Sequence, residues 1–129
     1  MIAIDTNLIV RYLTNDDREQ AAKARALVDA FETFVSTSVL LETAWVLQSV
    51  YQFAPARVAE ALAAFAGLPG VKLETPETAA RALAWARGPL DFADALHLAS
   101  AADCEAFVSF DKRLVEAAKA LGGVEVRSP

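Results

Sequence analysis

Four acidic residues, Asp5, Glu42, Asp94 and Asp111, stand at or soon after the ends of short apolar stretches. Carboxylate oxygens are the hard ligands that Mg²⁺ and Mn²⁺ prefer in proteins. The chain has one histidine, His97, and one cysteine, Cys104, so it lacks the Cys/His cluster that would favour zinc. The chemistry to consider is therefore a divalent metal site made of carboxylates.

The stretch LDFADALHLAS, from Leu90 to Ser100, contains two of the acids to be explained. Asp91 is a natural N-cap for the helix that follows. Asp94 lies beside His97 and Leu98 on a rather apolar face, where a carboxylate must be paired, protonated or bound to a cation. His97 is one turn away, and we expect it to be packed or hydrogen-bonded rather than to act as a general base.

Helix capping is the competing explanation for these acids. Asp5 and Asp111 each precede a helical segment and could cap it through their side chains. Glu42 is harder to explain in this way, because the residue three positions earlier, Val39, has no side-chain acceptor. Its place in the first turns of a helix suits the helix dipole, which contributes only about 0.3–1 kcal/mol.

The elements that would position these acids alternate between short β-type runs and helix-period segments. Thr37 or Ser38 is expected to cap the helix that contains Glu42. The alternation predicts a three-layer α/β/α sandwich around a mostly parallel central sheet of about five strands. The carboxyl ends of such strands meet at one sheet edge, so each acid could reach the same place. Strands are expected at 1–5, 33–36, 71–74, 106–109 and 124–127, and helices at 7–13, 17–31, 37–51, 55–66, 75–87, 91–103 and 112–121.

The composition of the chain limits the classes of function that it could have. With 129 residues, of which 55% are hydrophobic, we expect a single domain over residues 1–129. No apolar run approaches the roughly 20 residues that span a bilayer, and no secretory leader is expected. One cysteine suggests a reducing cytoplasm. The net charge of −5 argues against a broad basic face for nucleic acid, although bound cations could still bring phosphates to the protein.

The pieces IDTNLIVRYL, SVLLETAWVL, DFADALHLASA and FVSFDKRL, in this order and spacing, resemble the PIN-domain family. More narrowly, they are similar to the VapC-type toxin ribonucleases of type II toxin–antitoxin systems. This resemblance covers essentially the whole chain. It implies that Asp5, Glu42, Asp94 and Asp111 form the active site and bind metal, with Thr6, Asn7 and Ser109 as accessory residues.

The resemblance also implies an activity and its partners. The expected activity is a divalent-metal-dependent endoribonuclease that uses Mg²⁺ or Mn²⁺ to hydrolyse RNA phosphodiester bonds. The expected partners are an RNA substrate, a cognate antitoxin protein and a second copy in a homodimer. Arg11, Lys112 and Arg113 could steer RNA, although solvated surface charge explains each alone. The aromatic residues Trp45, Tyr51, Phe53 and Phe65 are expected mostly in packing rather than stacked on RNA bases.

Three other functions compete with this one. A haloacid-dehalogenase-like phosphatase also opens with a strand that ends in aspartate, but it needs a second acid where this chain has Asn7. A receiver-like module needs an aspartate where Glu74 stands. A catalytically silent PIN-fold binding module would not need acids at all four positions.

Overall fold

The computed structural model describes residues 1–129, in which short strands alternate with helices much as the sequence pattern predicts. Ile2–Ala3 is the shortest strand, although a strand over residues 1–5 was expected there. The elements in chain order are β1 (Ile2–Ala3), α1 (Thr6–Thr14), α2 (Arg18–Ala30), β2 (Thr33–Val35), α3 (Thr37–Ser49), α4 (Pro55–Ala66), β3 (Val71–Leu73), α5 (Pro76–Trp85), α6 (Phe92–Ser100), β4 (Ala106–Val108), α7 (Lys112–Ala118) and β5 (Glu125–Arg127).

Polar side chains begin most of these helices. Asp5, Asp91 and Asp111 each accept a hydrogen bond from a backbone N–H in the first turn of the following helix, so the capping interpretation is confirmed for all three. Helix α3 is capped by Ser36 rather than by Thr37 or Ser38, and that prediction was wrong. Ser36, Thr37 and Ser38 all carry a hydroxyl group that can cap a helix. Because β2 ends at Val35, Ser36 is the residue directly between the strand and the helix.

The strands form two parallel sheets. The first has the order β1–β2–β3, with Ile2 opposite Thr33 and Thr33 opposite Val71. The second consists of β4 and β5, with Phe107 opposite Val126. The predicted α/β class, the number of strands and their parallel direction are confirmed, and the strands are divided between two sheets instead of forming one.

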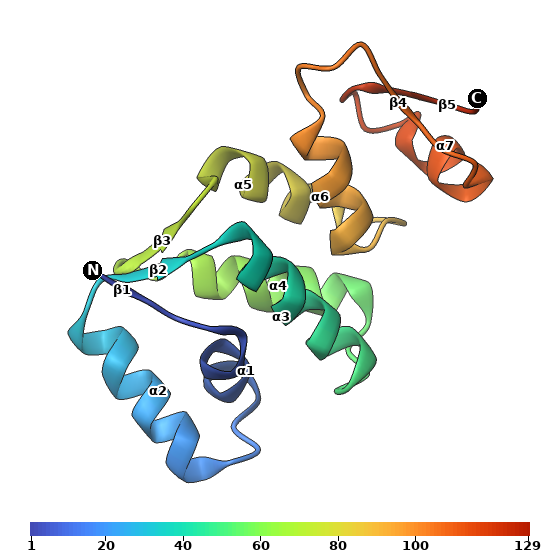
Figure 1. The fold of residues 1–129 in the computed structure, drawn as a ribbon. Helices are drawn as coiled ribbons and strands as arrows, with labels where there is room; N and C mark the ends of the chain where they lie inside the picture. Colours follow the sequence, from blue (N-terminus) through green and yellow to red (C-terminus); the bar gives the residue numbers. More distant parts are fainter.

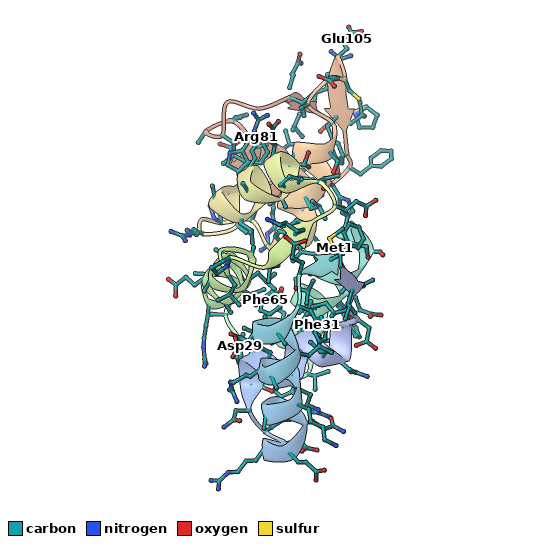
Figure 2. All side chains as sticks on the ribbon, turned by 90° about the vertical axis from the view of Figure 1, so that its left-hand side faces the viewer. Met1, Asp29, Phe31, Phe65, Arg81 and Glu105 are labelled. Carbon is teal, nitrogen blue, oxygen red and sulfur yellow. The ribbon has the colours of Figure 1, made fainter.

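Helices cover the β1–β3 sheet on opposite sides. In Figure 1, α1 and α2 lie below this sheet and α5 lies above it. Figure 2, turned by 90°, shows the same order, with Asp29 of α2 toward the bottom and Arg81 of α5 toward the top. The β4–β5 sheet and α7 lie at the upper right of Figure 1, joined to the rest through α6.

One cluster of 24 buried residues runs through both parts of the fold. Phe65 of α4 and Phe92 of α6 are each only 2% exposed, and such a side chain contributes roughly 1.5–3 kcal/mol through burial. Tyr12 of α1 packs edge-on against Phe65, with ring centroids 5.1 Å apart. Leu114 of α7 belongs to the same cluster, so apolar packing connects α7 to the core. None of the helices combines the length and apolar character needed to cross a membrane.

Candidate metal centre

The first pair of predicted site residues meets at the start of α1 and α3. Asp5 ends the segment after β1, and its Oδ1 accepts the Leu8 N–H at 3.0 Å. The next residue, Thr6, is buried and donates from Oγ1 to Oε1 of Glu42 on α3. Glu42 is otherwise exposed. This contact fixes one carboxylate oxygen of Glu42 beside the residue that follows Asp5, and its second oxygen remains able to bind a cation.

The second pair, Asp94 and Asp111, lines one cavity of about 290 Å³ between α6 and α7. Burial raises the pKa of Asp94, and the negative charges of Asp91 and Asp111 raise it further, while His97 lowers it. A half-buried carboxylate between two like charges is the environment that a divalent cation would relieve. The sequence expectation of a carboxylate in need of a partner at position 94 agrees with this environment.

The N-terminus of helix α7 fixes the position of the Asp111 side chain. Asp111 Oδ1 accepts the N–H groups of Arg113 at 3.0 Å and Leu114 at 3.2 Å. The Asp111 N–H in turn donates to Ser109 Oγ at 3.0 Å, so Ser109 orients the turn that carries the acid. Arg113 also lines the cavity, and it forms no ion pair with either carboxylate.

Asp91 lies near an acid of each pair, Glu42 in the first and Asp94 in the second. Sequence reasoning missed this role because it treated Asp91 only as a helix cap. Its Oδ1 accepts the Asp94 N–H at 2.9 Å, and its charge acts on Asp94. Asp91 also lines a groove of about 850 Å³ with Glu42. The signal was present in the sequence, since two acids three residues apart share one helix face.

The structure does not gather the four predicted acids around one point. Nowhere in the chain do three His, Cys, Asp or Glu side chains form a group that could hold a metal ion. The donor chemistry nevertheless fits a hard divalent cation, because Asp94 and Asp111 line a common cavity and burial disfavours charge on Asp94. A shared centre of all four acids stays a prediction.

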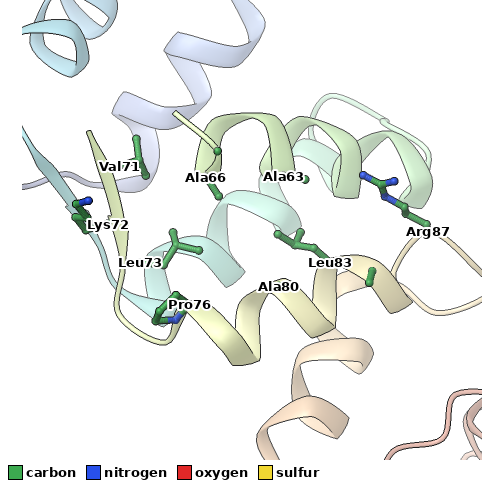
Figure 3. A pocket seen from close by; sticks show the side chains of 11 residues that line it. Ala63, Ala66, Val71, Lys72, Leu73, Pro76, Ala80, Leu83 and Arg87 are labelled. Carbon is green, nitrogen blue, oxygen red and sulfur yellow. The ribbon is translucent and has the colours of Figure 1, made fainter. Parts of the chain in front are cut away.

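The remaining candidates lie elsewhere. Asn7 lines a cavity between α1 and α2, whose lining includes none of the four acids. Arg11 is paired with Asp16 at 2.9 Å, and Lys112 has no ion pair. His97 is exposed. A further cavity of about 650 Å³, shown in Figure 3, lies between α4, β3 and α5; its lining is mostly apolar and includes none of the predicted site residues.

Comparison with known proteins adds one result to this geometry. The sequence model of the PIN domain matches residues 2–120, a range that includes every element from β1 to α7 and all four acids. No curated protein matches the chain.

Proposed function

The chain belongs to the PIN-domain family, whose members are in general nucleases that act on RNA with divalent metal ions, and we propose that it is an endoribonuclease dependent on Mg²⁺ or Mn²⁺. The proposal rests chiefly on the family match, which covers all four acids. A second observation supports it, because two of these acids, Asp94 and Asp111, line the same cavity. Membership in this family argues against the phosphatase and the receiver-like module. The catalytically silent PIN fold is separated from the nuclease by experiment.

In this proposal Asp5, Glu42, Asp94 and Asp111 hold the cation. A bound divalent ion supplies positive charge that activates water and neutralises the phosphodiester and its leaving oxygen. Thr6 orients Glu42 through its hydrogen bond, and Ser109 orients Asp111 through the turn before α7. Arg113, which lines the same cavity as Asp94 and Asp111, would offer its guanidinium to a phosphate. Asn7 has the least support of the accessory residues, since it lines a different cavity.

Action of all four acids on one ion requires the β4–β5 sheet to approach β1. β1 is an edge strand of the first sheet and β4 is an edge strand of the second, so each has backbone groups available for a new neighbour. Asp5 follows β1 and Asp111 follows β4. Parallel pairing of these two strands would therefore bring both acids to one sheet edge.

The biological setting is proposed on the same basis. The chain would act in the cytoplasm as the toxin of a type II toxin–antitoxin pair, with residues 1–129 as one domain. An antitoxin arginine would pair with the carboxylates. Exposed apolar side chains support contact with a partner or a second copy in a homodimer; they include Val50, Val108 and Phe110.

The test is cleavage of total RNA by purified protein with Mg²⁺ or Mn²⁺, beside EDTA. Cleavage should require metal and should be lost in Asp5→Asn, since asparagine retains the helix cap but removes the charge. Phe31→Ala, a change at an exposed residue in a different cavity, should cleave like the original chain. No cleavage under any metal condition would favour the silent binding module.

A further inference from the structure

Trp45 is exposed to an unusual degree for so large an aromatic side chain. Two thirds of it, 66%, is accessible to solvent, and it has no stacking or cation partner within the chain. The other tryptophan, Trp85, is half-buried, with the Arg81 guanidinium 6.0 Å from its ring. The expectation that the aromatic residues serve mostly in packing is confirmed by Tyr51, Phe53 and Phe65, which lie in or against the core, and Trp45 is the exception.

Trp45 lies in the same groove as Glu42. This groove of about 850 Å³ runs between one face of α3 and the start of α6, within the size range of small-molecule sites, about 300–1000 Å³. Glu42, Trp45 and Gln48 follow each other at three-residue intervals on α3, which is a rise of about 4.5 Å per step along the helix. A carboxylate, an aromatic face and an amide therefore stand in a row.

The chemistry of this row matches a nucleotide, so we propose that an unpaired base of single-stranded RNA stacks on the Trp45 indole while its phosphate lies toward Glu42. This inference rests on the proposed nuclease function. Stacking on an aromatic side chain is available to every base, provided that its face is not covered by a neighbour in a duplex. A divalent ion held by Glu42 would offset the repulsion between that carboxylate and the phosphate.

Gln48 favours a base over a basic peptide as the occupant. Its side chain is exposed and has no hydrogen-bond partner in the chain, and its amide both donates and accepts. The edge of a nucleobase offers both kinds of group. A guanidinium offers only donors, so an arginine side chain could satisfy only the carbonyl oxygen of the Gln48 amide.

Fluorescence isolates the Trp45 contact. In the double variant Asp5→Asn/Trp85→Phe, Trp45 is the only tryptophan and RNA is not cleaved during the titration. With Mg²⁺ present, a mixed-sequence single-stranded RNA of about 12 nucleotides should quench its emission, and the same sequence as a duplex should not. Unchanged emission with the single strand would overturn the inference, as would equal quenching by the duplex or by an arginine-rich peptide alone.

Kinetics then separate this inference from the proposed function. Trp45→Ala should raise KM for a single-stranded RNA about tenfold and leave kcat within about twofold, while Trp45→Phe should retain most of the affinity. Phe31→Ala serves as the matched control for loss of an exposed aromatic side chain. If the original chain cleaves RNA and Trp45→Ala has an unchanged KM, the stacking inference is refuted and the nuclease function is not. A change in the oligomeric state of Trp45→Ala would also refute the stacking inference. Failure of the original chain to cleave would refute the nuclease.

Discussion

The hydroxyl of Thr6 donates a hydrogen bond to the carboxylate of Glu42, joining the first turn of α1 to α3 across 36 positions of the sequence. Thr6 is only 7% exposed, so the contact anchors an exposed acid to a buried point of the fold. It is the most direct link between the segment that carries Asp5 and a second predicted metal ligand.

Replacement of Thr6 by valine removes this hydroxyl while keeping the side-chain shape. We expect RNA cleavage to fall about tenfold, as for other residues that orient metal ligands, and the free energy of unfolding to fall by about 1 kcal/mol. Thr6→Ser retains the hydroxyl and should retain most of the activity. Activity rates and chemical denaturation measure both effects, and equal rates for valine and serine would exclude an orienting role.

Asp111 has two roles that two substitutions can separate. It caps α7, and it is a predicted metal ligand. Asp111→Ala should lower stability by about 1 kcal/mol and abolish cleavage, while Asp111→Asn should keep the cap and lose only cleavage. Thermal unfolding in EDTA and RNA cleavage are compared for the two variants. Full activity in Asp111→Asn would show that Asp111 serves only as a helix cap.

Asp94 should destabilise the metal-free protein when it is ionised. Its folded-state pKa is raised by burial, by Asp91 and by Asp111, so stability should increase as the pH falls through that raised pKa. Asp94→Asn should therefore melt at a higher temperature than the original chain at pH 7 in EDTA, with a flatter pH dependence. Melting curves between pH 4 and 8 check this. A lower melting temperature for the variant would contradict the argument from crowded charges.

Asp16 shows the opposite shift, outside the proposed site. The Tyr51 hydroxyl, with Thr14 and Arg11, holds the pKa of Asp16 at about 2. The ionised carboxylate therefore adds stability above its unfolded pKa of about 3.9, and this stability is lost as the pH falls toward 2. Tyr51→Phe should move the pKa of Asp16 upward, which NMR titration of its carboxyl carbon measures directly. An unchanged pKa would mean that Tyr51 is not the main cause.

The sequence was most informative where local chemistry decides the structure. The order of strands and helices follows from apolar periodicity, and Asp5, Asp91 and Asp111 each stand at a helix start where an aspartate can cap. Asp94 could be singled out as an unusual carboxylate because its helix neighbours are apolar. These inferences need only residues within a turn or two of one another.

Long-range relationships were less accessible. Strands of two or three residues carry too little pattern to specify their neighbours, so the division into two sheets could not be anticipated. The exposure of Trp45 depends on what packs against α3, which helical spacing alone does not reveal. Asp91 was overlooked for the same reason: its cap is local, whereas its place in the Glu42 groove is tertiary.

The central claim is that acids from both parts of the fold bind the same ion, and calorimetric titration with Mn²⁺ tests it most directly. Glu42→Gln changes an acid on α3, which follows a strand of the first sheet, and Asp111→Asn changes the acid that caps α7, which follows a strand of the second. If the two acids act on a shared ion, each variant should weaken Mn²⁺ binding at least tenfold. Unchanged Mn²⁺ affinity in either variant would show that the acids do not form one centre.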